Sequence, residues 1–444
     1  MTTVSTHPPI PRAVWWAGGL AAGAAAYTGV QVASGAPRAA TVLPLALAGA
    51  AALGWLALTR FFHFVLAVLV LRSALDAVKL GGALDTSREA TVSGLLDPGT
   101  ILGVLFVVAG TAWLAVQGPG GAAGRALPWA MLGLLGATAL GAVGSRAAGA
   151  SAGEVMRVAA LVVMLLVVRR LVADDPGRRE PLLLAVFAAA VLPVLTTVHQ
   201  VGTGNGLVDV HGVLRAHGTF WHPNMLGIFC ALLLVMGVAL LPHVPALPRA
   251  GLFLLGAGLG FALVFSYARG AWLALALGLV VVALLQDRRI LVGLAAAGAV
   301  VLVAVPSVTA RLSDLSDPAG SLSWRFEHWG RALDLVGANP VTGVGPAAAR
   351  ALLGREVHND YLRALVETGL VGLLACLALL AALALTARRA LREARSPLAR
   401  GVAVGFAGCV AALALFAVAD NVLTSVAVLW YLLVFAGIAS GEPR

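Results

Sequence analysis

The feature that most constrains this chain is a series of long apolar runs built mainly of Ala, Leu, Val and Gly. Each run is about 18 to 22 residues long, which is the length an α-helix needs to cross the hydrocarbon core of a bilayer. Only 11% of the 444 residues are charged and 60% are hydrophobic, whereas about 25% of the residues of a soluble domain are charged. The composition therefore excludes a soluble globule and indicates a polytopic membrane protein.

The pattern within the runs decides between helices and strands. Strands of outer-membrane β-barrels alternate polar and apolar residues over segments of about ten residues, and these runs do not alternate. We therefore predict an all-α fold, a polytopic transmembrane helical bundle of about 12–14 helices with a large, partly helical external loop. The predicted transmembrane helices span residues 13–33, 39–58, 61–80, 99–117, 126–147, 154–173, 181–199, 223–241, 250–266, 270–286, 290–309, 369–387, 401–419 and 422–439.

The distribution of arginine sets the expected orientation. The strongest basic cluster lies between residues 388 and 400, on the same side of the predicted bundle as both termini. Because short cytoplasmic loops collect basic residues, this side is predicted to face the cytoplasm, and the chain is predicted to be a multi-pass protein of the cytoplasmic (inner) membrane. The same rule accounts for the net charge of +10, so nucleic acid is not expected as a partner.

Two segments on the opposite side are too long and too polar to be simple connections. Residues 200–222 and about 310–368 hold an unusual share of the aromatic, His, Asp, Glu, Asn and Arg residues of the chain. Loops of this length are usually functional. We therefore divide the chain into N-terminal transmembrane helices (1–199) and a catalytic half (200–444), whose site faces the periplasm or the exterior.

Part of the second external segment has the pattern of an amphipathic helix. Its apolar residues recur at spacings of three and four, at Leu322, Phe326, Trp329, Leu333 and Val336. Such a helix could lie on the membrane or cap a cavity. It could equally pack on the core of its own loop.

Arginines accompany the turn-rich motifs of the external side. Arg215 precedes the stretch Gly218–Asn224, which leads directly into a helix. Arg269 lies at the break between two helices, and Arg325 lies in the amphipathic segment. A guanidinium group binds phosphate oxygens through two parallel N–H groups, so three arginines on one face suit an anion such as a diphosphate. Each arginine taken alone could instead anchor the protein at the membrane interface.

His358 is the candidate for proton transfer, because imidazole titrates near neutral pH. Asp360 and Glu367 are the nearest alternatives for that role. Three further histidines lie on the same side: His211, His217 and His222. Their spacing does not match a helical zinc pair, and no carboxylate or cysteine completes a ligand set, so we expect neither a metal nor another cofactor. The sequence also lacks a GxxxxGK[ST] loop and a GxSxG elbow, which argues against ATP-driven transport and against a serine hydrolase.

Taken in order, these motifs resemble the O-antigen ligase and polymerase superfamily of integral-membrane glycosyltransferases. The matching segments are Arg215 to Asn224 (Arg, then G-x-F-x-x-P-N), Ser266 to Trp272 (S-x-x-R-G-A-W), Trp324 to Trp329, Pro340 to Gly345 (P-x-x-G-x-G) and His358 to Gly372 (H-N-x-Y-L, then E-x-G-x-x-G). The resemblance covers about residues 200 to 440. One departure is His222, where the family usually has a small or polar residue.

The resemblance implies an inverting, metal-independent transfer on the outer face of the cytoplasmic membrane. The donor would be a polyprenyl-diphosphate-linked oligosaccharide, and the acceptor a hydroxyl of a glycan, a lipid or another molecule, with membrane lipids around both. By position, Arg215, Arg269 and, less directly, Arg325 would hold the diphosphate, and His358 would be the catalytic base. Supporting roles fall to Asn224, Asn359, Asp360, Tyr361 and Glu367.

A lipid-linked glycan flippase or a secondary transporter is the main alternative, and it would need ionisable groups within the membrane. The few such groups are Asp76 and Lys79, which could pair across one helical turn, Arg72, Arg157, and Asp420 at a helix end. Among enzymes, the acceptor could be a lipid A core (a ligase), another lipid-linked repeat (a polymerase), or a protein or wall polymer. The excess of Arg over Lys fits a GC-rich genome. An organism with such a genome that lacks lipopolysaccharide would have no lipid A core as acceptor, which slightly favours the polymerase.

Overall fold

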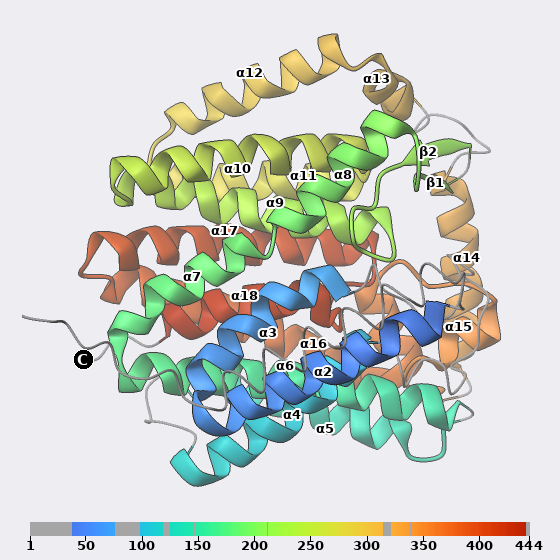
Figure 1. Cartoon of the computed structure of the whole chain (residues 1–444). Helices are drawn as coiled ribbons and strands as arrows, with labels where there is room; N and C mark the ends of the chain where they lie inside the picture. The colour runs from blue at the N-terminus through green and yellow to red at the C-terminus, as the bar shows by residue number, and fades with distance from the viewer. Residues whose placement is uncertain are drawn as a thin grey trace, which may run out of the picture.

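The computed structural model describes residues 38–75, 98–118, 125–145, 147–210, 212–313, 321–337 and 339–440. Within these ranges most residues are helical, and the strands are β1 (Val208–Val210) and β2 (Val213–Arg215), an antiparallel pair. The predicted all-α transmembrane bundle is confirmed (Figure 1). The predicted helix at 13–33 and the pair of Asp76 and Lys79 lie outside the described residues.

Most of the helices follow the predicted apolar runs, and α14 and α15 lie in the external segment 310–368. Their bounds are α2 (Arg38–Thr59), α3 (Phe61–Leu75), α4 (Pro98–Gln117), α5 (Ala126–Ala142), α6 (Ala148–Asp174), α7 (Arg179–Ala188), α8 (Val191–Thr203), α9 (Pro223–Leu240), α10 (Ala246–Phe265), α11 (Arg269–Leu285), α12 (Arg289–Ala304), α13 (Pro306–Ser313), α14 (Ser321–Val336), α15 (Ala348–Leu353), α16 (Asp360–Glu393), α17 (Pro397–Ala419) and α18 (Val426–Ala439). In the described part of the chain, six helical segments are long and apolar enough to cross a membrane, and shorter apolar helices such as α11 and α18 pack among them.

One predicted helix, at 181–199, is interrupted between α7 and α8. Pro193 has no N–H group to donate to the carbonyl of Ala189, so the helical ladder breaks there. The hydroxyl of Ser73 donates to that carbonyl at 2.6 Å instead. The chain therefore breaks an apolar run without leaving a buried carbonyl unsatisfied.

A kink at Gly369 divides α16. Its φ of 66° lies in the left-handed region, and a Cβ at this position would lie 2.2 Å from the carbonyl carbon of Val341. The turn at 340–345 fits into the kink, where the N–H of Gly345 donates to the carbonyl of Glu367 at 2.9 Å. Only glycine fits this approach. The predicted helix at 369–387 begins at this kink, whereas α16 begins earlier, at Asp360.

The core of the bundle lies around α17 and α18. On α18, Trp430 and Tyr431 are buried and donate to backbone carbonyls of α6 and α3, at 3.1 and 2.9 Å. On α17, Gly408 faces Gly278 of α11, and a Cβ on Gly408 would lie 2.7 Å from the Gly278 carbonyl oxygen. Small residues at such contacts let membrane helices approach closely. α11 and α17 are thus fixed against each other.

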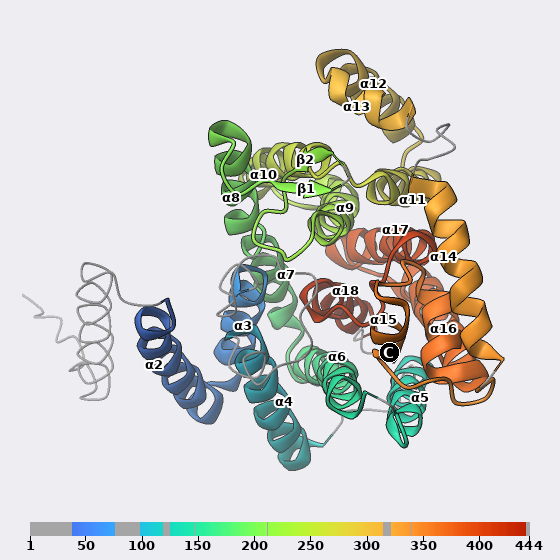
Figure 2. The ribbon, with the colours of Figure 1, turned by 90° about the vertical axis from the view of Figure 1, so that its right-hand side faces the viewer.

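Polar structure gathers at one end of this bundle, on the right in Figure 1. The hairpin β1–β2, α14 and α15 all lie there, so the described parts of the two long polar segments, 200–222 and 310–368, meet at the same end. α14 runs across the ends of the spanning helices at the edge of the molecule (Figure 2). The arginine cluster at 388–400, between α16 and α17, lies at the opposite end.

Candidate active site

The site begins at the end of β2, where Arg215 is only 3% exposed. Its Nε donates to the backbone carbonyl of Ser266 at 2.7 Å, and one Nη donates to Oδ1 of Asn224 at 2.5 Å. A guanidinium group has no acceptor, so Asn224 must present its oxygen to Arg215 and its amino group to the other side.

The amino group of Asn224 contacts the residue that follows α17, Asp420. Nδ2 of Asn224 donates to Oδ2 of Asp420, and Nδ1 of His358 lies 2.9 Å from Oδ1 of Asp420. An ionised carboxylate only accepts, so Nδ1 carries a hydrogen and the neutral ring keeps its lone pair on Nε2. Arg215, Asn224, Asp420 and His358 therefore form one continuous line of hydrogen bonds.

His358 is held in an unusual backbone conformation. Its φ of 52° lies in the left-handed region that non-glycine residues rarely adopt. Its side chain is 23% exposed, and its ring meets the ring of Trp324 with 6.2 Å between centroids. Asp420 and Trp324 thus orient the ring, and Nε2 is the nitrogen left for proton transfer.

Two further arginines lie beside Asp420. Arg325, on α14, donates to the carbonyl of Ala419 at 2.8 Å. Arg269 begins α11, and a Cβ on the next residue, Gly270, would lie 3.1 Å from the Cβ of Ala419. Burial lowers the pKa of Arg325, the charge of Asp420 opposes this effect, and the charge of Arg269 adds to it. The two guanidinium groups are therefore close enough to repel each other.

Three arginines gather around the carboxylate of Asp420. Burial alone would raise the pKa of Asp420, but the charge that His358 carries when protonated and the hydrogen bond from His358 hold that pKa well below its usual value. The described structure connects this carboxylate to Arg215 through Asn224 and places it near Arg325, which in turn lies near Arg269. Guanidinium groups gathered in this way suit an anion rich in phosphate oxygens.

His222, the departure from the family pattern, is the N-cap of α9. Its Nδ1 accepts the backbone N–H of Asn224 at 3.1 Å, and Pro223 occupies the first helical position. A helix start needs a side-chain acceptor for its free N–H groups. A neutral imidazole supplies that acceptor, so His222 here does the work of the usual small polar cap.

We expect His222 to make stability fall between pH 6.5 and pH 4. Burial lowers its pKa from 6.5 to about 4, so in this window the unfolded chain binds a proton that the folded chain does not. Stability is full above pH 6.5 and declines as the pH falls, by about 3 kcal/mol in total. Melting temperatures of the purified protein between pH 7 and pH 4 test this. His222→Asn keeps a capping acceptor and should lose this decline; an unchanged decline would contradict the assignment.

Three of the predicted supporting residues stand at the start of α16. Asn359 caps the helix through Oδ1, and the hydroxyl of Tyr361 donates to a backbone carbonyl of α17 at 2.8 Å. Oδ2 of Asp360 accepts two backbone N–H groups of the loop after α17, at 2.6 and 2.8 Å. These contacts hold the loop that begins with Asp420, next to His358.

Glu367 and the two glycine motifs lie together at the kink of α16. A Cβ on Gly343 would lie 2.3 Å from the carbonyl carbon of Glu367, and the Gly345 N–H donates to the Glu367 carbonyl. The segments P-x-x-G-x-G and E-x-G-x-x-G thus pack on each other through their backbones. This packing fixes the kink of α16.

No three His, Cys, Asp or Glu side chains gather as possible metal ligands in the ranges that the structure describes. His217 lies within hydrogen-bonding distance of Gln200 through one ring nitrogen and of the Phe220 carbonyl through the other. His222 caps α9. His211 lies outside the described residues.

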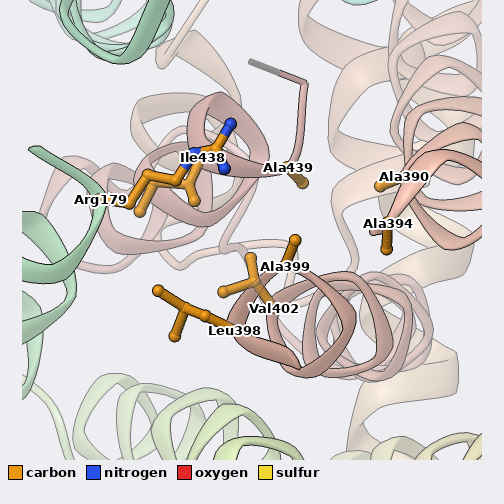
Figure 3. A pocket seen from close by; sticks show the side chains of 8 residues that line it. All are labelled: Arg179, Ala390, Ala394, Leu398, Ala399, Val402, Ile438 and Ala439. Atoms are coloured by element: carbon orange, nitrogen blue, oxygen red, sulfur yellow. The ribbon is translucent and has the colours of Figure 1, made fainter. Parts of the chain in front are cut away.

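A small pocket lies at the opposite end of α17 (Figure 3). It is lined by Arg179 and by small or aliphatic residues such as Leu398, Val402 and Ile438. At 1.5 Å per residue, α17 separates this pocket from Asp420 by about 30 Å. The pocket contains none of the predicted site residues and is separate from the candidate active site.

Residues 251–377 match the family model described as O-antigen ligase. This match supports the predicted O-antigen ligase and polymerase superfamily, and with it a glycosyltransferase-type enzyme that handles lipid-linked glycans in a membrane. No curated protein is significantly similar to the chain.

The matched range contains only part of the candidate site. Arg269, Arg325 and His358 fall within the matched range, whereas Arg215 precedes it and Asp420 follows it. The fold nevertheless joins these last two to His358 by hydrogen bonds. The site therefore extends beyond the matched range on both sides.

Asp420 is the site residue that sequence analysis did not assign to the site. The sequence alone indicates only a charge at a helix end. The available signal was its position immediately after an apolar helix, at the external end where His358 was already placed. Arg363, which forms ion pairs of 3.2 Å with both Asp360 and Glu154, was not predicted either, because Glu154 lies 209 residues away in the sequence.

Proposed function

We propose that this protein transfers a glycan from a polyprenyl-diphosphate-linked donor to an acceptor hydroxyl, as an O-antigen polymerase or ligase does. The observation that carries the proposal is the hydrogen-bonded line from Arg215 to His358 through Asn224 and Asp420. The reaction needs neutralisation of the leaving group and removal of a proton from the acceptor. The hydrogen-bonded line contains an arginine suited to the first task and a histidine suited to the second.

In the proposed reaction, the acceptor hydroxyl gives its proton to Nε2 of His358 while its oxygen bonds to the anomeric carbon of the donor. The bond from that carbon to the diphosphate oxygen breaks, and polyprenyl diphosphate leaves with the electron pair. Attack from the opposite face inverts the anomeric configuration. Asp420 stabilises the imidazolium that forms, and Arg215, Arg269 and Arg325 neutralise the diphosphate.

The flippase or transporter finds less support among the described residues. Arg157 forms an ion pair with Glu154 on the same helix. Asp420 is bound to His358 at the polar end of the bundle, where it belongs to the site described above. These charges therefore have local partners and do not form a chain across the membrane.

We expect purified protein in proteoliposomes to transfer glycan from a polyprenyl-diphosphate oligosaccharide at an unchanged rate in the presence of EDTA. The reason is that the proposed partners of the diphosphate are the guanidinium groups of Arg215, Arg269 and Arg325, which need no metal. Appearance of the elongated or transferred product measures the reaction. Loss of transfer in EDTA with recovery in Mg²⁺ would contradict metal independence. Donor that crosses the membrane without transfer would favour the flippase.

We also propose that the site faces the periplasm or the exterior, with both termini in the cytoplasm. Asn205→Cys at the site end and Arg395→Cys at the other end test this, since both positions are exposed. An impermeant maleimide should label position 205 in intact cells, and position 395 only after permeabilisation. The native thiols are buried and give little background: Cys230, Cys376 and Cys409. The reverse pattern would overturn the orientation.

A further inference from the structure

α14 has an inner face that packs on the bundle. His328 and Ala332 are buried on this face, and Ala332 packs with Val357 and Val366 in a small core of its own. Nε1 of Trp329 donates to the carbonyl of Val357 at 2.9 Å. The inner face is therefore packed against the rest of the protein. It contains only part of the apolar residues of this helix.

The exposed arc of α14 is divided into two strips. Each strip consists of three residues whose directions around the helix axis lie within about 60° of one another, because successive residues are rotated by about 100°. The two strips lie side by side. The first strip is apolar: Phe326, Gly330 and Leu333. The second strip is charged: Glu327, Arg331 and Asp334. Phe326 is 64% exposed and Leu333 is 53% exposed, so no part of the described chain covers the apolar strip.

The position of α14 indicates what covers the apolar strip. The helix crosses the ends of the spanning helices and lies at the edge of the bundle, beside α11, α16 and α17 (Figures 1 and 2). Arg325 bonds to the carbonyl of Ala419, the last residue of α17. α14 therefore lies at the depth where a spanning helix ends, which is the interface between headgroups and acyl chains.

We propose that α14 is an interfacial helix, with its apolar strip in the lipid leaflet on the side of the site and its charged strip in water. A helix lying in the membrane plane needs this side-by-side division of its exposed arc, whereas a helix surrounded by water does not. Burial of Phe326 and Leu333 among acyl chains gives the exposed apolar area a favourable environment.

This placement has a consequence that rests on the proposed function. Arg325 immediately precedes Phe326 and bonds toward the bundle, so adjacent residues contact the site and the lipid. The helix would hold the Arg325 guanidinium at headgroup depth. A diphosphate carried on a lipid lies at the same depth, so the donor can reach the site without leaving the leaflet.

Spin labels on adjacent cysteines test the proposal. Leu333→Cys and Asp334→Cys are compared in vesicles of phosphatidylethanolamine and phosphatidylglycerol, with Val303→Cys, 84% exposed on α12, as the lipid reference. Oxygen concentrates in acyl chains and a nickel chelate in water. The ratio of oxygen to nickel collision rates should be several-fold higher at 333 than at 334, and close to the ratio at 303.

Equal ratios at 333 and 334 would overturn the proposal, because a lid in water shows no difference between the strips. Protection of position 333 from both reagents would overturn it too, since a second copy or another protein would then cover the strip. The measurement needs no turnover. The depth of α14 can therefore be determined even if the protein does not transfer glycan.

Discussion

His358→Asn is expected to lower the rate of glycan transfer by about 10²- to 10⁴-fold, or roughly 3 to 5 kcal/mol, because general-base catalysis is worth about that much. His358 meets the two conditions for a base in the described structure. Its Nδ1 is oriented by Asp420, and its side chain is partly exposed. Transfer by purified protein in proteoliposomes measures the effect.

Asn is a better replacement than Ala at this position. The φ of 52° is tolerated by Asn more readily than by Ala, so the local backbone and the cap of α16 should survive. His199→Ala, on the exposed face of α8 at the same end of the protein, is the matched control and should transfer normally. If His358→Asn keeps a rate within about tenfold of the wild type while its melting temperature is unchanged, another group is the base.

The helical bundle was predictable because a bilayer leaves few alternatives. Long apolar runs can satisfy their backbone groups in lipid only as helices, and the observed helices follow those runs. The differences arise where one residue changes the backbone. Pro193 divides a run into α7 and α8, and Pro306 divides the predicted helix at 290–309 into α12 and α13. Hydropathy does not register such breaks.

The last predicted helix, at 422–439, shows a second kind of difference. The structure begins α18 at Val426, and the preceding residues form a short loop held by Asp360 and by the side chain of Arg363, which donates to Thr424 at 2.7 Å. The loop is apolar enough to pass for the start of a helix. It became a loop through long-range polar contacts, which a local pattern does not contain.

The candidate site was predictable only as a set of residues on one side. Motif order brought Arg215 and His358 into one hypothesis, and their roles remain predictions. Their connection runs through Asn224 and Asp420, which lie 196 residues apart. Periodicity and spacing cannot foresee a contact of that length, because it depends on how α9 and α17 pack. The split of α14 into lipid-facing and inward-facing apolar residues has the same origin.

Asp420→Asn is expected to reduce transfer by about 10²- to 10⁴-fold as well, for a reason set by hydrogen-bond counting. The carboxylate accepts from Asn224 on Oδ2 and from His358 on Oδ1. An amide has one accepting oxygen and one donating nitrogen, so it can serve only one of these partners. If the nitrogen faces His358, Nδ1 must accept and Nε2 then carries the hydrogen, which removes the base. If it faces Asn224, the link to Arg215 is lost.

The same substitution also tests whether Asp420 acts through His358. If it does, adding Asp420→Asn to His358→Asn should cost little further activity, whereas two independent losses would multiply. Asp209→Asn, an exposed aspartate of β1 at the same end of the protein, is the matched control and should leave transfer unchanged. A double variant whose loss equals the product of the two single losses would separate Asp420 from the base, and the line from Arg215 to His358 would then be a structural contact.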